Sequence, residues 1–274
     1  MQNLDMHTTR TARRLGLMRR LPLLVPALML WLAGASVTRA DPPWPAEWPI
    51  VLPPVRGRLP PLPPPLPPQP PATRSAARVL EVIERVRQTM RETRYQHHLV
   101  VRERQGIYRW DCSLMAQWVL RRAAPRSVRH LDPLSRPLAE HFVRTIERAP
   151  ATGSRSARNG WHRVEGIAEV RAGDVFAWRR PPGFPSRNTG HVGFTLEAPR
   201  QVPGLPGGWA VRVADATGSL HQDDTRTWPG EGGFGIGVLV FLADAEGRGT
   251  HYGWGGTYSS GYVVTPILFG RVRP

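Results

Sequence analysis

Residues 41–72 limit the fold more than any other part of this 274-residue chain. The segment is dominated by prolines in pairs and triplets and contains almost no helix-forming sequence. Such a composition predicts an extended, semi-rigid spacer of the polyproline II type, and docking on a proline-binding module is the alternative. Residues 73–274 remain, about 200 residues, which is enough for one domain with a substantial core.

Residues 1–40 have the order of a secretory signal, in which arginines precede an apolar stretch and a small-residue end. The apolar stretch, residues 21–35, is shorter than the roughly 20 residues that a spanning helix needs. We therefore expect export to the periplasm or the extracellular cell wall, with cleavage after Ala40. An uncleaved signal that tethers the protein to a membrane is the alternative, and paired arginines leave a twin-arginine route open.

The charge of the chain favours anionic surroundings. The sequence has 37 basic residues, all of them arginine, against 21 acidic ones, for a formal net charge of +16. This balance suits cell-wall polymer or lipid head groups, although an arginine-biased genome would produce it too. The arginines are scattered and no nucleic-acid motif is present, so we expect no nucleic-acid partner.

Periodicity predicts helices first and strands afterwards. Apolar residues at helical spacing indicate helices over residues 75–93, 113–124 and 137–148. Short β-branched and aromatic runs between glycines and prolines then predict strands over residues 175–178, 191–196, 209–214, 236–242 and 262–269. This order predicts an α+β fold, with the N-terminal helices packed on a mostly antiparallel sheet.

Cys112 is the only cysteine and sits just before the second predicted helix, with Asp111 as a natural N-cap. A lone thiol in an exported chain cannot form an internal disulfide, so it is either buried and inert or chemically employed. Unpaired N–H groups and the helix dipole stabilise a thiolate at a helix start. Cys112 is therefore the candidate nucleophile.

A thiolate nucleophile needs a base, and His191 is the best candidate because it begins a predicted strand that would hold its ring firmly. Asp215 ends the next predicted strand and would lie beside His191 if the two strands pair in antiparallel fashion. One histidine with two neighbouring aspartates, in residues 221–224, lacks a convincing ligand spacing, so we expect a polar loop there and no metal site.

Three motifs in this order resemble the NlpC-type cell-wall cysteine peptidases of the papain-like superfamily. They are Asp111-Cys112-Ser113, Gly173-Asp174-Val175 and Gly190-His191-Val192-Gly193. The resemblance implies a papain-like fold, attack by cysteine on an amide, histidine as base and acid, and a polar orienting residue, here Asp215. It also implies that Tyr108 lines the site, and Asp111 and Ser113 are the other candidate substrate-binding residues.

These expectations together predict an exported cysteine endopeptidase or amidase that hydrolyses amide bonds of peptidoglycan stem peptides without a cofactor. Acyl transfer to an amine would use the same residues. Leu114 replaces the glycine that usually follows the Asp-Cys-Ser motif. This departure motivates the alternative of a catalytically inactive module that binds the cell wall.

Overall fold

The computed structural model of the chain describes residues 62, 64–129, 131, 136–227, 230 and 232–274, all of which belong to one compact unit, Trp44–Pro274. The predicted signal segment and most of the predicted spacer lie outside the described residues. Spacer residues 64–71 are described and form neither helix nor strand. No helix in the described part of the chain is long and apolar enough to cross a bilayer.

The three predicted helices form, each within a few residues of the predicted bounds. The four α-helices among the described residues are α1 (Arg74–Thr89), α2 (Cys112–Ala123), α3 (Pro125–Val128) and α4 (Ala139–Glu147). The Thr73 side chain caps α1 by accepting a hydrogen bond from the Ala76 N–H at 2.9 Å. The Asp111 side chain caps α2 in the same way, which confirms the predicted helix start.

Six antiparallel strands close into a β-barrel. They are β5 (Val175–Arg179), β6 (Gly190–Thr195), β8 (Gly208–Thr217), β9 (Gly233–Ala243), β10 (Gly249–Gly253) and β11 (Val263–Val272). The hydrogen-bonded order is β10-β9-β8-β6-β5-β11, and β10 also pairs with β11, which completes the ring. Two short strands extend the sheet beyond the ring, β4 (Trp161–Val164) beside β11 and β7 (Arg200–Gln201) beside β8.

The predicted papain-like α+β fold is therefore wrong. The described part of the chain is mostly β, its helices are short, and its main sheet closes on itself instead of lying open against a helical layer. Closure depends on β10, which the sequence presents as a glycine-rich loop. Because β10 gains its strand conformation from β9 and β11 on either side, local periodicity does not reveal it.

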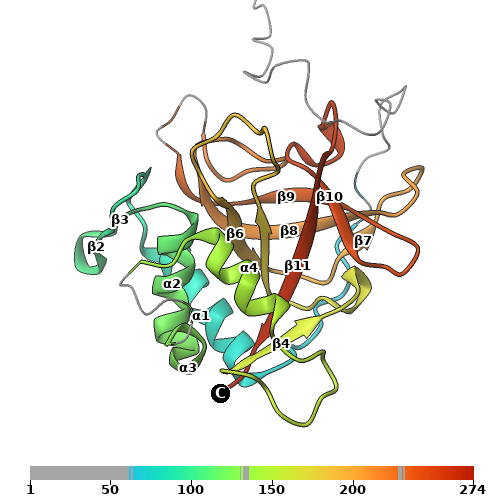
Figure 1. Cartoon of the computed structure of the whole chain (residues 1–274). Helices are drawn as coiled ribbons and strands as arrows, with labels where there is room; N and C mark the ends of the chain where they lie inside the picture. The colour runs from blue at the N-terminus through green and yellow to red at the C-terminus, as the bar shows by residue number, and fades with distance from the viewer. Residues whose placement is uncertain (1–61, 63, 130, 132–135, 228–229, 231) are drawn as a thin grey trace, which may run out of the picture. The chain divides into compact units, whose positions relative to one another are not determined.

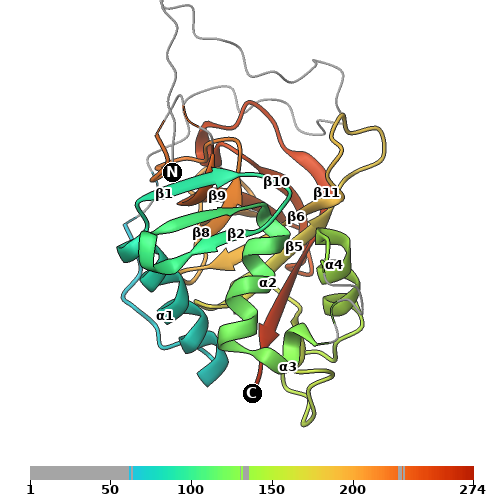
Figure 2. The ribbon, with the colours of Figure 1, turned by 90° about the vertical axis from the view of Figure 1, so that its left-hand side faces the viewer.

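Alternation along the barrel strands divides the two larger of the three apolar clusters among the described residues. Phe176, Trp178 and Phe241 belong to the cluster inside the barrel, whereas Val175 and Ala177 belong to the cluster under the helices. Successive side chains of a strand point to opposite faces, so one strand serves both cores. Helices α2 and α4 pack on β6, and Figures 1 and 2 show the helices gathered on one side of the barrel.

A small second sheet leads into α2. It consists of β1 (Glu92–Tyr95), β2 (Val100–Arg102) and β3 (Ile107–Trp110). The predicted helix over residues 75–93 runs two residues into β1, and no strand is predicted in this region. Strand β3 lies between the other two and ends directly before Asp111. Both β1 and β3 contact β9, so this sheet fixes the start of α2 against the barrel. Three single 3₁₀ turns complete the described elements: η1 (Glu103–Gln105), η2 (Ile167–Glu169) and η3 (Gly256–Tyr258).

Candidate active site

Cys112 is the first residue of α2 and is 4% exposed. Its backbone N–H lies in the first helical turn, where no preceding helical carbonyl is available to accept it. The neighbouring Asp111 accepts from the Leu114 N–H at 2.8 Å. The thiol therefore sits at the positive end of the helix dipole, which favours the thiolate form of a cysteine.

His191 and Asp215 meet on adjacent strands of the barrel. Strands β6 and β8 pair in antiparallel fashion, with Phe194 opposite Ala214. This register brings His191 Nε2 to 2.7 Å from Asp215 Oδ2. The structure thus brings together the two residues that the sequence pairs as base and orienting group.

The other nitrogen of His191 is not engaged by Asp215, and Cys112 acts on this ring through its charge and a hydrogen bond. Burial by itself lowers the pKa of His191, but the negative charge on Cys112 and the hydrogen bonds to Asp215 and Cys112 raise it to about 9. The imidazolium form of His191 is therefore stable at neutral pH. A thiolate–imidazolium pair is the form in which cysteine nucleophiles react.

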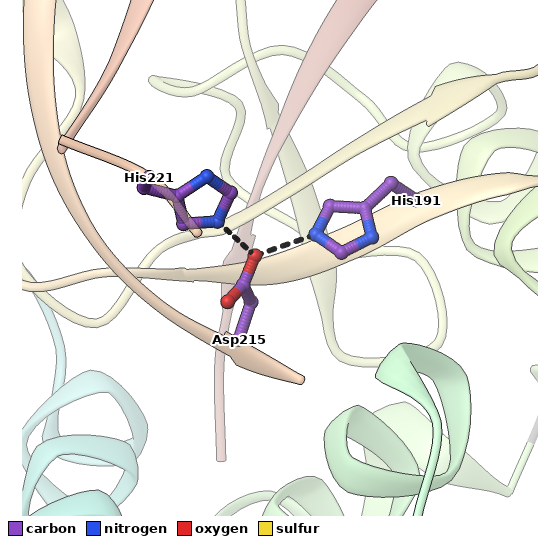
Figure 3. A group of neighbouring side chains, drawn as sticks. All are labelled: His191, Asp215 and His221. Carbon is purple, nitrogen blue, oxygen red and sulfur yellow. Dashed lines mark hydrogen bonds and ion pairs between the residues drawn. The ribbon is translucent and has the colours of Figure 1, made fainter. Parts of the chain in front are cut away.

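Asp215 is the centre of a larger buried network (Figure 3). His221 Nε2 also lies 2.7 Å from Asp215 Oδ2, and an Arg226 N–H donates to Asp215 Oδ1 at 3.0 Å. Burial would raise the pKa of Asp215, but His221, Arg226 and the hydrogen bond from His191 hold it well below its usual value. Asp215 is thus a fully buried carboxylate with three donors.

The same three side chains, His191, Asp215 and His221, bring their ligand atoms within 4.8 Å of one another, a spacing that a metal ion could also use. The distances favour hydrogen bonds. Tetrahedral ligands of one zinc ion stand roughly 3.3 Å apart when each bond is about 2.0–2.1 Å. Both ring nitrogens instead lie 2.7 Å from the same carboxylate oxygen.

Aromatic rings cover this network. Trp254 lies edge-on to His191 at 5.1 Å between ring centroids and 4.4 Å from the ring of His221. Trp178, which is paired with His191 across β5 and β6, lies 5.0 Å from it. These rings exclude water from the hydrogen bonds, which strengthens them by lowering the local dielectric constant.

A cavity of about 310 Å³ opens beside Cys112. Its walls come from β1, the start of α2, the start of α4 and the loop before β6, and its lining residues are Tyr95, His97, Asp111, Cys112, Ser113, Arg136, Leu138, Ala139, Arg187, Asn188, Thr189 and Gly190. A larger hollow of about 610 Å³, lined by residues 201–209, has no titratable side chain. The smaller cavity is therefore the candidate substrate site.

The predicted substrate-binding residues divide into two groups. Asp111 and Ser113 line the cavity, and Ser113 Oγ lies 3.8 Å from Cys112 Sγ. Tyr108 is 1% exposed, packs on Trp110 and Trp118 in the core, and is not among the residues that line the cavity. Tyr95 is the tyrosine in the cavity wall.

Tyr95, His221 and Arg226 are the main residues that sequence reasoning missed. The Tyr95 hydroxyl accepts a hydrogen bond from Asn188 Nδ2 at 3.1 Å, and burial, together with the negative charge on Cys112, raises its pKa. It remains a neutral donor at the cavity. The sequence offers no local signal for these residues, because Tyr95 reaches the site from β1, whereas His221 and Arg226 reach it from a polar loop between β8 and β9.

Comparisons of the chain with protein-family models, with curated proteins and with solved structures return no match. The chemistry of the site is therefore the basis for assigning a function to this chain.

Proposed function

We propose that this protein is an exported cysteine amidase or endopeptidase that hydrolyses amide bonds in peptidoglycan stem peptides. One observation carries the proposal: Cys112 begins a helix, its charge acts on His191, and His191 Nε2 lies 2.7 Å from the buried Asp215 carboxylate. Nucleophile, base and orienting group thus stand in the order that covalent acyl transfer requires.

In the proposed reaction, the Cys112 thiolate attacks the carbonyl carbon of the substrate amide. The backbone N–H of Cys112, at the start of α2, stabilises the oxyanion of the tetrahedral intermediate. The Tyr95 hydroxyl oxygen already accepts a hydrogen bond from Asn188, so its O–H can donate a hydrogen bond to the same oxyanion. Both donors belong to the walls of the cavity beside the thiol.

His191 then moves the protons. Its imidazolium protonates the departing amine as the carbon–nitrogen bond breaks, which leaves a thioester between the acyl group and Cys112. The neutral imidazole next takes a proton from water, which attacks the thioester. Breakage of the carbon–sulfur bond releases a carboxylic acid and restores the thiolate–imidazolium pair. Asp215 engages Nε2 of the ring, which leaves Nδ1 as the nitrogen that exchanges protons in this scheme.

The charge of the cavity supports an anionic peptide as substrate. Arg136, Arg187 and His97 line it, and Asp111 is the one acidic residue among the described side chains that line it. Arg136 is 2.7 Å and His97 3.1 Å from the Asp111 carboxylate. Arg187 is exposed at the rim of the cavity. Cell-wall stem peptides carry free carboxylates, which a basic rim would attract.

The test is mass spectrometry of purified muropeptides after incubation with the wild-type protein and with the variants Cys112→Ala and His191→Gln. We expect wild-type protein to give fragments cut within the stem peptide. Both variants should lose turnover by several orders of magnitude, because the nucleophile or the base is absent. His251→Gln is the matched control, since His251 lies on β10 and bonds only its neighbour Thr250 among the contacts described.

Fragments that persist with Cys112→Ala would refute the mechanism. Wild-type protein that leaves muropeptides intact but sediments with purified cell wall would instead favour the inactive binding module.

A further inference from the structure

His221 is buried inside the network around Asp215 and takes no direct part in the reaction proposed above. Its side chain is 0% exposed, and both of its ring nitrogens have partners. Nε2 lies 2.7 Å from Asp215 Oδ2, and Nδ1 lies 3.2 Å from the backbone oxygen of Trp254. We propose that His221 is a positioning residue whose ring is protonated on both nitrogens. In this form it fixes Asp215 against His191 and neutralises the buried cluster of Asp215, Asp224 and Arg226.

The protonation of His221 follows from the chemistry of its two partners. A backbone carbonyl can only accept a hydrogen bond, so Nδ1 must donate. An ionised carboxylate is also an acceptor only, so Nε2 must donate as well. A histidine that donates from both nitrogens is an imidazolium. Asp215 is ionised because the Arg226 guanidinium, which can only donate, lies 3.0 Å from it and helps to hold its pKa well below the usual value.

The charges of the cluster balance only when His221 is cationic. Asp215 and Asp224 supply two buried negative charges, and Arg226 supplies one positive charge through hydrogen bonds to both. Burying an unpaired charge is costly, and His221 supplies the missing positive charge. The Cys112–His191 pair can then exchange its proton in surroundings of no net charge.

The fold makes room for this arrangement. Gly235 and Gly237 lie on β9 opposite the two cationic side chains. A Cβ at Gly235 would come within 2.3 Å of Arg226, and one at Gly237 within 2.7 Å of His221. The backbone N–H of His221 is in turn held by Asp224 Oδ2 at 2.8 Å. Small residues on the strand and a carboxylate in the loop thus set the position of His221.

The charge on His221 acts on a pair that several other charged groups also face. These groups are Asp215 on β8, Asp224 and Arg226 in the loop before β9, Tyr95 on β1, and Asp111 with its partners His97 and Arg136 near the start of α2. Removing one positive charge leaves the network around Asp215 with a net negative charge. That charge disfavours the thiolate, so Cys112 should react only at higher pH.

The inference rests on the nucleophile assigned in the proposed function, and the test needs no substrate. We would measure the rate at which iodoacetamide alkylates Cys112 as a function of pH, by intact mass, in wild-type protein and in His221→Gln. Glutamine retains a donor for Asp215 but carries no charge. The pH midpoint of alkylation should rise by about one unit, which is the order of magnitude for removing one positive charge from a buried network. His251→Gln, the control, should leave it unchanged.

A purely structural role for His221 would slow alkylation without moving its midpoint, and that result would overturn the inference. If His221→Gln does not fold, long-range nitrogen–proton NMR spectra of the wild type decide the matter. Two protonated ring nitrogens on His221 at pH 7 support the inference, and one unprotonated nitrogen refutes it. One equivalent of tightly bound zinc in the purified protein would also refute it, because the two histidines would then be metal ligands.

The result is independent of the substrate. If the alkylation midpoint shifts in His221→Gln but the wild type leaves muropeptides intact, the role of His221 is supported and the proposed function is rejected. If the wild type cleaves muropeptides but the alkylation midpoint of His221→Gln is unshifted, the proposed function stands and the role of His221 is rejected.

Discussion

Asp215 connects more of the site than any other single residue among those described. Its carboxylate accepts from His191, His221 and Arg226, and it has no exposed surface. Each partner lowers the free energy of the ionised form, which outweighs the cost of burial and keeps the pKa of Asp215 well below its usual value. This carboxylate therefore sets both the orientation and the proton affinity of His191.

At the residue scale, we predict that the alkaline limit of activity reports His191. The imidazolium is present up to its pKa of about 9, so kcat/KM should fall above pH 9. Asp215→Asn removes the carboxylate that raises this pKa and should move the alkaline limit down by one unit or more. The measurement is the pH dependence of kcat/KM on a muropeptide, with folding checked by circular dichroism. An unchanged alkaline limit in the variant would contradict the prediction that Asp215 raises the pKa of His191.

The pKa of His191 also makes a prediction about stability. It is raised from an ordinary value of 6.5 to about 9, so the native state binds the proton more tightly than the unfolded chain does. The resulting stabilisation is complete below about pH 6.5 and disappears as the pH rises through 9. Denaturant unfolding between pH 6 and 10 should show this decline, and His191→Gln should weaken it.

At the scale of the element, the start of α2 combines a cap with a nucleophile. Asp111 satisfies the Leu114 N–H through Oδ1, while Oδ2 accepts from Arg136 and contacts His97. Strand β3 ends directly before the cap residue Asp111, and α2 follows with a face buried against α1, β6 and β8. The position of Cys112 therefore depends on a strand, a cap and a helix that follow one another without a loop.

Two substitutions at Asp111 should separate its roles. Asp111→Ala removes the acceptor for Leu114 and should cost about 1 kcal/mol of unfolding free energy, within the usual 0.5–2 kcal/mol for a lost cap. Asp111→Asn keeps an acceptor and removes the charge, so it should cost clearly less. Guanidinium unfolding of both variants measures the difference. Equal losses would mean that the ion pair with Arg136, not the cap, stabilises this helix start.

At the scale of the whole molecule, the barrel and the helical layer share their strands. Each shared strand sends alternate side chains into the barrel and under the helices, as Val175 and Phe176 do. The two cores cannot separate without breaking the same hydrogen bonds. The folded unit should therefore unfold in one cooperative transition, although the apolar cluster inside the barrel does not include Cys112.

A cavity made inside the barrel tests this coupling. Phe241 is 0% exposed and its ring contacts Phe176, Trp178 and Phe269. Phe241→Ala should lower the unfolding free energy by about 3–5 kcal/mol, whereas Tyr258→Ala, at a side chain 65% exposed, should change it by less than about 0.5 kcal/mol. Circular dichroism and the exposure of Cys112 to a thiol reagent should give coincident transitions. Exposure of the thiol at a different denaturant concentration would contradict a single cooperative unit.

Local patterns determined a definite part of this protein. The spacing of apolar residues fixed the helices, and Asp111 before Cys112 fixed the start of α2, because capping and periodicity act within a few residues. Runs of β-branched residues located β5, β6, β8, β9 and β11 for the same reason. His191 and Asp215 could be paired from the sequence because neighbouring strands of a meander usually pair.

Tertiary structure alone decided the rest. Closure of the barrel requires β10 to pair with both β9 and β11, and those contacts join residues whose local sequence indicates only a loop. His221 and Arg226 follow Asp215 in a polar stretch that resembles a surface loop, yet both are buried. Their burial is stable only because Asp215 and Asp224 compensate their charge, and that compensation exists only once the chain is folded.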